Sequence, residues 1–502
     1  MIPSFCNRIK TNYTYLYVSL FLGLSLGSCT WLYAQDNWVT SLETVGTFSS
    51  PRVADLNQDQ VLDIIIGAGR EEFHACDSAV VALDGKTGAL LWKIHAKDQI
   101  FGSAALTDLN EDGIADPLIG GRSAELIAID GNKGKVIWRF DPIKHADQSE
   151  QEHWFNFYNP QFIKDQNKDG IQDILVSNGG DVMAAPYDPN RPPGYLAVIS
   201  GKDGRLLARA PMPDGKETYM SITVSPEKQG RDYEIVFGTG GETIGGSLYV
   251  AKLSDVLKGD LSSARVLDSS KDKGYIGPAG KVDITGDGVN DIVVNTVNGR
   301  LIAFNGKNYE KLWEVVRPNS ESYSSIAIGH FNADETPDFF VSYAQGVWPK
   351  LDWSAQIMVN GKNGAIEFTD SLGFYQNTTP VVLDFNNDGQ DEILMSVNFH
   401  EFKNGFQKFF YNILVVIDFK VNDVLQLGNV FEGNNLSSTP WIGDLDQDNM
   451  LDIIYCHGTN NRHTYTFDGI KIHRIATTLP LYKKIKWGAY QGSNYDGIFH
   501  KE

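Results

Sequence analysis

Seven stretches of this sequence carry carboxylate and amide side chains at fixed offsets. Each has the form Asp-x-Asn-x-Asp-Gly-x-x-Asp or a close variant, and the stretches begin at residues 55, 108, 165, 283, 330, 384 and 444. Oxygen ligands at alternate positions of a tight loop are what Ca²⁺ requires, and a glycine at position six lets the backbone turn. Asp and Asn also favour turns, but seven copies at one spacing indicate cation sites. The pattern predicts several structural Ca²⁺ ions and disfavours zinc and copper, which prefer His or Cys.

The expected ligands occupy positions one, three, five and nine of each loop. The two complete copies are Asp108, Asn110, Asp112, Asp116 and Asp165, Asn167, Asp169, Asp173. Four variants keep the ligands, namely Asp55, Asn57, Asp59, Asp63; Asp283, Thr285, Asp287, Asp291; Asp384, Asn386, Asp388, Glu392; and Asp444, Asp446, Asp448, Asp452. In the seventh copy, His330, Asn332, Asp334 and Asp338, a histidine replaces the first Asp, and the sequence leaves metal binding by this copy open. Carboxylates gathered in this way repel one another, so cation binding should be coupled to folding.

Short strands surround every loop. Each loop joins two apolar strands, and a second strand pair with a Gly turn follows, as in VVALDGKTGALLW (80–92) and GRLIAFNGKNYEKLW (299–313). Four antiparallel strands in roughly 55 residues, repeated along the chain, are typical of propeller blades. The interval from 165 to 283 is double, and residues 225–241 keep a strand while lacking the Asp ladder, so we expect an eighth, metal-free unit there. The prediction is an all-β, eight-bladed β-propeller in a single domain of residues 35–502, with a seven-bladed ring as the alternative.

Two families share these features. The loops resemble the FG-GAP and VCBS repeats of integrin-α-type propellers, most fully in FGSAALTDLNEDG (101–113). The strands ALDGKTGALLW and AIDGNKGKVIW resemble the quinoprotein-type (PQQ-like) repeats of eight-bladed propellers, including periplasmic outer-membrane assembly factors. The resemblance implies a calcium-binding propeller but not one particular activity, because such folds host many tasks.

The first 34 residues have the composition of a signal peptide. Arg8 and Lys10 precede an apolar run, and Leu32-Tyr33-Ala34 offers a cleavage site. Processing before Cys29, with a lipid anchor on that cysteine, is the alternative. Both predict an exported protein located in the periplasm, at the cell surface or outside the cell. No later segment reaches the roughly 20 apolar residues of a membrane span.

Charge and cysteine content narrow the partners. The formal net charge of −20 disfavours nucleic acid. After cleavage at Ala34 only Cys76 and Cys456 remain, either as buried thiols or as a disulfide between neighbouring blades. The aromatic tail from about Lys486 is expected to pack where the first and last blades join. We expect a monomer.

No catalytic motif is present, since the chain lacks a Ser-His-Asp order, HExxH, a phosphate loop and CxxC. Two aromatic groups are candidate ligand surfaces, although both also suit packing: His153, Trp154 and Tyr158, and Trp348 and Trp353. The sequence favours a calcium-stabilised binding or adhesion module for a protein or polysaccharide. The alternatives are a calcium-dependent carbohydrate-active enzyme such as a polysaccharide lyase, and an envelope assembly scaffold. A quinone-dependent dehydrogenase is disfavoured because vicinal cysteines are absent.

Overall fold

The computed structural model describes residues 34–144, 154–226, 232–374 and 378–500, all within one compact unit, Ala34–Glu502. The predicted signal peptide before Ala34, including Cys29, lies outside the described residues. Within the described ranges no helix is long and apolar enough to cross a membrane.

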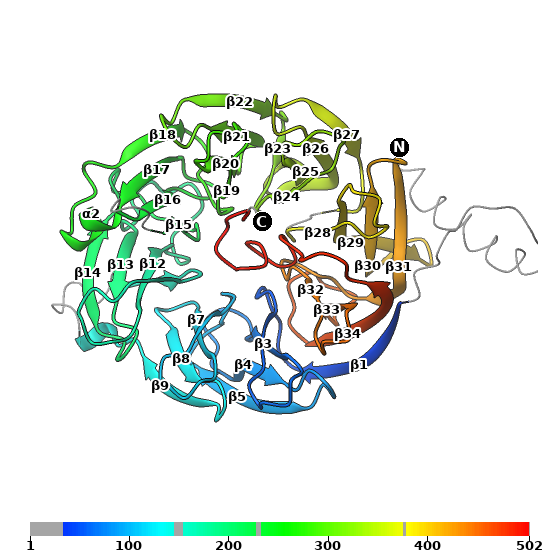
Figure 1. Ribbon diagram of the computed structural model, residues 1–502, viewed down its shortest axis with the longest axis horizontal. Coiled ribbons are helices and arrows are strands. Elements are labelled where there is room, and N and C mark those ends of the chain that lie inside the picture. Colours follow the sequence, from blue (N-terminus) through cyan, green and yellow to red (C-terminus); the bar gives the residue numbers. More distant parts are fainter. Residues whose placement is uncertain (1–33, 145–153, 227–231, 375–377, 501–502) are drawn as a thin grey trace, which may run out of the picture. The chain divides into compact units, whose positions relative to one another are not determined.

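The described chain forms eight antiparallel sheets that follow one another around a ring, as Figure 1 shows. The predicted eight-bladed propeller is confirmed, and the seven-bladed alternative is wrong. From the inner to the outer strand, the first four blades are β2 Arg52–Ala54, β3 Asp63–Gly67, β4 Cys76–Leu83, β5 Leu90–Ala96; β6 Ala105–Thr107, β7 Asp116–Gly120, β8 Leu126–Asp130, β9 Lys135–Arg139; β11 Gln161–Ile163, β12 Asp173–Gly179, β13 Tyr195–Ile199, β14 Leu206–Pro211, with β10 Asn156–Phe157 also on β12; and β15 Thr223–Ser225, β16 Glu234–Gly238, β17 Gly246–Lys252, β18 Arg265–Ser270.

The other four blades have the same order. They are β19 Gly280–Val282, β20 Asp291–Asn295, β21 Arg300–Phe304, β22 Lys311–Val316; β24 Ala327–Gly329, β25 Asp338–Val347, β26 Lys350–Val359, β27 Ile366–Asp370, with β23 Ser320–Glu321 also on β25; β28 Val381–Leu383, β29 Glu392–Lys403, β30 Gln407–Asp418, β31 Asp423–Glu432; and β32 Trp441–Gly443, β33 Met450–Gly458, β34 Gly469–Pro480, β1 Ala34–Glu43. The only helices in the described ranges are α2 Leu253–Leu257 and the 3₁₀ turn η2 Pro142–Lys144. The blade from β15 to β18 is the unit expected without an Asp ladder.

Burial explains the strand patterns. The second strand of a blade lies between two neighbouring blades, so a continuous apolar run such as β3 or β7 is buried at every residue. The outermost strand faces solvent on one side, and in β5 buried and more exposed residues therefore alternate from Trp92 onward. Strands of both kinds match the sequence pattern that predicted them.

A tryptophan on the outer strand joins several blades to the next. The indole N–H of Trp92 donates to the carbonyl of Gly131 in the following blade at 2.7 Å. The same bond recurs from Trp138 to Gly201, from Trp313 to Gly361 and from Trp38 to Gly85. These bonds fix the rotation of one blade against its neighbour at four of the eight interfaces.

The N-terminal strand closes the ring. β1 pairs antiparallel with β34, with Val39 opposite His473 and Leu42 opposite Ile470, so the last blade takes its outermost strand from the start of the chain. Pairing of β1 covers an edge that β34 would otherwise expose. The C-terminal tail, expected to pack where the first and last blades join, contacts both of them: the N–H of Ile442 donates to the carbonyl of Gly488 at 2.8 Å, and the Arg52 guanidinium lies 3.9 Å from the ring centre of Tyr495. That expectation is confirmed, although β1 supplies the strand that closes the ring.

The tail also crosses the centre of the ring, as the red C-terminal segment in Figure 1 shows. The carbonyl of Trp487 accepts the N–H of Val382 at 2.9 Å, and the N–H of Phe499 donates to Lys281 at 2.8 Å. Further along the tail, Gln491 accepts a hydrogen bond from Asn159 at 3.3 Å. Besides the first and last blades, the tail thus touches inner segments of the third, fifth and seventh blades, so it is docked across the centre of the ring.

The two cysteines of the ring are free, buried thiols in one apolar cluster of the first and last blades. Burial raises the pKa of both thiols. The disulfide that the sequence left open is not formed.

We predict that a chain truncated after Pro480 melts several degrees below the full chain. Trp487 and Phe499 are buried, and removal of the tail exposes both the inner strands and the apolar area that such aromatic rings cover, about 150–250 Å² each. Thermal unfolding followed by circular dichroism measures the difference. Tyr482→Ala, at an exposed tail position, is the control and should melt like the wild type. Equal melting of the truncated and full chains would contradict the structural role of the tail.

Candidate functional site

The Asp loops all connect the first and second strands of their blades, so they lie at one end of the ring, which we call the Asp-loop end. The Gly turns between third and fourth strands lie at the same end, because the strands are antiparallel. The hairpins between second and third strands lie at the other end, called the hairpin end.

The carboxylate at position nine of each loop is buried and bound to backbone N–H groups. In the second blade, Asp116 accepts the N–H of Leu109 at 2.8 Å and of Asn110 at 3.1 Å with one oxygen, and the N–H of Gly131 at 2.8 Å with the other. Asp63 and Asp291 make the same three bonds in their own blades. Position nine, predicted as a cation ligand, therefore ties the Asp loop to the Gly turn beside it.

The oxygens at positions one and three converge. Asp108 and Asn110 both accept the N–H of Asp112, at 3.2 and 3.0 Å. The equivalent pairs of the first, third and seventh blades do the same, so two side-chain oxygens face one point in each of these loops. The carboxylate at position five accepts a backbone N–H two residues on, as Asp112 does from Ile114 at 3.0 Å. Solvent reaches positions one, three and five in the second blade, whereas position nine is inaccessible.

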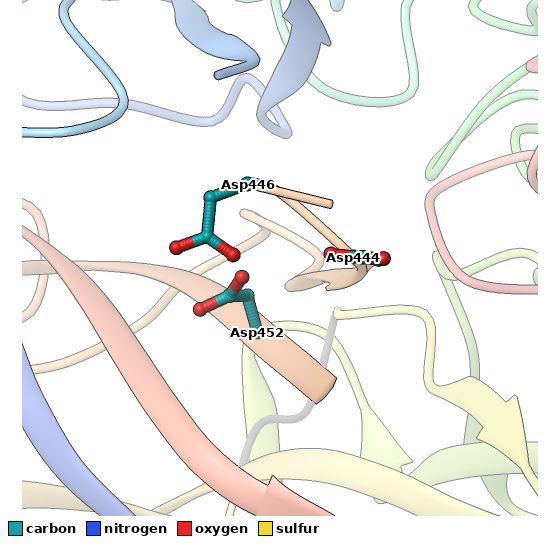
Figure 2. Close-up of side chains that lie close together, drawn as sticks. All are labelled: Asp444, Asp446 and Asp452. Carbon is teal, nitrogen blue, oxygen red and sulfur yellow. The ribbon is translucent and has the colours of Figure 1, made fainter. Parts of the chain in front are cut away.

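The loop of the last blade differs from the others because an arginine on β34 reaches into it. Asp444, Asp446 and Asp452 are the one group of three carboxylates in the described chain whose oxygens lie within 4.8 Å of one another. Figure 2 shows the carboxylates of Asp446 and Asp452 turned toward each other. The buried guanidinium of Arg474 binds both, with its Nε 3.0 Å from Asp452. Arginine therefore already neutralises two of the carboxylates expected to bind Ca²⁺.

Lysines lie beside other loops. Lys420 pairs with Asp388 at 3.0 Å, and Lys133 lies 3.7 Å from Asp112. The His330 ring packs against the tail residue Phe499, with ring centres 5.9 Å apart, and burial lowers the pKa of this histidine. Through its His330 ring, this loop therefore makes an apolar contact with the tail.

The first aromatic candidate surface is part of the core. Trp154 and Tyr158 are only 6% and 8% exposed. The Trp154 ring lies 4.8 Å from that of Phe140, and Tyr158 lies 5.5 Å from Phe101, so these rings fill the space between neighbouring blades. Their burial leaves little ring surface for a ligand. His153 lies outside the described residues.

The second candidate surface lies at the hairpin end. Trp353 on β26 is 37% exposed. Trp348 is half-buried, and its backbone N–H donates to the carboxylate of Glu321 at 3.1 Å. The backbone of Trp353 forms a β-bridge with that of Phe374, whose ring lies 5.4 Å from His400 on β29. Phe374 therefore lies between Trp353 and the neighbouring hairpin.

The length of that hairpin was not predicted from the sequence. β29 and β30 have twelve residues each and pair to their tip, Lys403 with Gln407, whereas β7 and β8 have five each. Phe402 and Phe406 near the tip are 60% and 77% exposed. The run HEFKNGFQKFF (400–410), in which aromatic and basic residues are interleaved, was the available signal.

Two buried ion pairs at the hairpin end were also missed. Arg191 lies 2.7 Å from Glu217, which in turn accepts the hydroxyl hydrogen of Tyr219 at 3.0 Å. Lys273 lies 2.7 Å from Glu321 of the next blade but one. No local spacing in the sequence joins these residues, because each pair comes from segments more than 25 residues apart.

Solved structures that resemble this chain share its fold, an eight-bladed β-propeller. It resembles quinohemoprotein alcohol dehydrogenase from Comamonas testosteroni, with 12% identity, 88% of this chain and 76% of that chain covered, and a TM-score of 0.55. A europium-containing methanol dehydrogenase gives 13% identity, coverage of 88% and 93%, and a TM-score of 0.53. BamB from Moraxella catarrhalis gives 9% identity, coverage of 88% and 100%, and a TM-score of 0.46.

The family follows from the sequence itself. The FAM234A/B β-propeller family model matches residues 38–383, so the chain belongs to that family. No curated protein matches the sequence. The solved structures support the quinoprotein-like part of the predicted resemblance as a likeness of fold.

We predict that the metal-free chain loses stability as the pH rises from about 4 to about 8. Burial raises the pKa of Asp63 to about 6 and of Asp338 to about 7; burial and the neighbouring acids raise that of Glu392 to about 8. These groups keep their protons in the folded chain after the unfolded chain has released them near pH 4, so deprotonation favours unfolding across this window.

Glu392→Gln tests the largest of these shifts. In EDTA, the drop in melting temperature between pH 5.5 and 8 should be smaller for Glu392→Gln than for the wild type. Glu401→Gln, on the same strand, should behave like the wild type. An unchanged drop in Glu392→Gln would contradict the predicted protonation.

Proposed function

We propose that this protein is an exported binding propeller that contacts a protein partner through the long hairpins of its sixth and seventh blades. The single observation that carries this proposal is the aromatic and basic surface of these hairpins, formed by the exposed Trp353, Phe402, Lys403 and Phe406 and the half-buried Lys408. We call this set the hairpin surface. Export is supported by the composition of residues 1–34.

The β29–β30 hairpin carries rings on both faces. On one face, His400 lies opposite Phe410 and Phe402 lies opposite Lys408. On the other, the ammonium group of Lys403 lies 4.6 Å from the ring centre of Phe409. Stacked cations hold the rings at defined positions without burying the outermost ones.

This composition suits a protein interface. Single exposed apolar residues are common, but rings clustered with cations on a projecting hairpin are the residue types that dominate binding energy in interfaces. The lysines of this surface carry positive charge, whereas the chain as a whole has a formal net charge of −20. A partner with acidic groups around an apolar pocket would complement it.

We further propose that the Asp loops bind Ca²⁺ and stabilise the ring. The oxygens that would hold the ion are at positions one, three and five, for example Asp108, Asn110 and Asp112, because position nine is engaged with the backbone. The first, third and seventh blades offer equivalent sets. The cation would neutralise carboxylates that otherwise repel one another. In the last blade Arg474 supplies this charge, so we expect weaker Ca²⁺ binding there.

We predict that photo-crosslinking will identify the partner. A benzophenone amino acid replacing Phe406 should form one prominent adduct in the producing cells, and Phe402→Ala should greatly reduce it without changing the melting temperature. The same photoreactive residue at Tyr187, an exposed aromatic position of the third blade at the same end, is the matched control. A protein adduct at 406 only supports the proposal. A polysaccharide adduct or the same adducts at both positions would contradict it.

We predict that Ca²⁺ raises the melting temperature measured in EDTA, because an ion that binds only the folded chain stabilises it. Asp112→Ala removes a carboxylate from a complete loop and should reduce this increase. His330→Ala should leave it unchanged. Calorimetric titration counts the bound ions, and the absence of any Ca²⁺-dependent change would refute the proposed sites.

A further inference from the structure

A cavity of about 190 Å³ lies between the tail and the inner segments of the first three blades. Its lining includes Arg52 at the start of β2, Ser103, and Gln491 and Tyr495 of the tail. A single water needs only about 10–15 Å³ on this measure. The cavity therefore has room for a small molecule near the centre of the ring.

Arg52 brings an unpaired cation to this cavity. Its side chain is 1% exposed, its guanidinium lies 3.9 Å from the ring centre of Tyr495, and its Nε donates to the carbonyl of Ala104 at 3.2 Å. Its NH1 has no hydrogen-bond partner, and in the described part of the chain no carboxylate lines the cavity or pairs with Arg52. Burial lowers the pKa of Arg52 to about 10, so it remains charged at neutral pH.

The positive charge of Arg52 is unusual because it is buried and has no carboxylate partner among the described residues. A buried cation without an anion is costly, and the other buried cations described above, Arg474, Arg191 and Lys273, each pair with a carboxylate. The Tyr495 ring offsets part of this cost, but it leaves the NH1 donor unsatisfied. An anion bound in the cavity would satisfy both the charge and the donor.

Other groups in the cavity are donors as well. Gln491 is 1% exposed, and its Nε2 has no partner among the described residues, while its Oε1 accepts the bond from Asn159. The Oγ of Ser103 accepts the N–H of Ser50 at 2.9 Å, so its own hydrogen can be donated to a ligand. Leu106 and Phe162 add apolar walls. The donors suit oxygen acceptors on a negatively charged group.

We propose that this cavity binds a small oxyanion, a carboxylate or phosphate group, with Arg52 as its cation and Gln491 and Ser103 as further donors. The site is independent of the hairpin surface and of the Asp loops. Because Gln491 belongs to the tail, the ligand would also hold the tail in place.

Titration of the purified mature chain tests this site. Inorganic phosphate and succinate are added separately at constant ionic strength, with chloride as the reference anion, and binding is measured by calorimetry and melting temperature. We expect at least one of the two to bind one-to-one and to raise the melting temperature, and the arm that binds identifies the preferred group. Arg52→Lys should weaken this binding at least tenfold, because lysine lacks the planar fork of donors. Arg205→Lys, at an exposed site, should bind as the wild type does.

A second variant covers the case in which Arg52→Lys does not fold. Gln491→Glu places a carboxylate in the cavity, so it should raise the melting temperature in chloride and abolish oxyanion binding. Binding of neither anion by the wild type would overturn the proposal. Unchanged binding in Arg52→Lys or in Gln491→Glu would overturn it as well.

Discussion

The hydrogen-bonded connection between a buried carboxylate, a glycine peptide and a tryptophan organises this propeller. Asp116 accepts the N–H of Gly131, and the carbonyl of the same residue accepts the indole N–H of Trp92 from the preceding blade. One glycine residue thus joins an Asp loop, a Gly turn and the neighbouring blade. The arrangement recurs with Asp63, Asp173 and Asp338, including at the interface where the ring closes. Because the carboxylate holds the glycine whose carbonyl accepts the indole N–H, loss of the carboxylate should free the Gly turn to shift and weaken the contact between blades.

Because of this connection, the two ends of the ring differ in how far their loops are constrained by the fold. At the Asp-loop end, the carboxylate at position nine binds backbone N–H groups, whereas solvent reaches positions one, three and five in the second blade. The hairpin end has no such repeated constraint, so its connections vary in length from blade to blade. The β29–β30 hairpin, with twelve residues in each strand, and its exposed rings occur there. The centre is filled by the tail, and the unpaired charge of Arg52 marks the place where that filling is incomplete.

The repeated loops made the fold predictable from the sequence. Their spacing placed the blades, and the strand from Glu234 revealed the blade that lacks a ladder. The role of position nine was not predictable, because Asp116 has the same spacing whether it binds a cation or backbone N–H groups. Arg474 enters the last loop from 22 residues beyond Asp452, a relation that no loop motif contains. The contact of the tail with the first and last blades was predicted, but its contacts with the third, fifth and seventh blades were not, because Trp487 and Gln491 meet inner segments with no complementary pattern in the sequence. The roles of Phe402 and Phe406 depend on exposure, which aromatic content alone does not give.

The division between position nine and the other loop positions is tested most directly by comparing Asp116→Asn with Asp112→Asn in EDTA. An asparagine at 116 turns an N–H group toward backbone donors, so this variant should melt several degrees below the wild type. Asp112→Asn should melt like the wild type in EDTA, because that carboxylate is partly solvated and serves the cation. Equal melting of Asp116→Asn and the wild type, or a larger loss in Asp112→Asn, would contradict the structural role of the buried carboxylate.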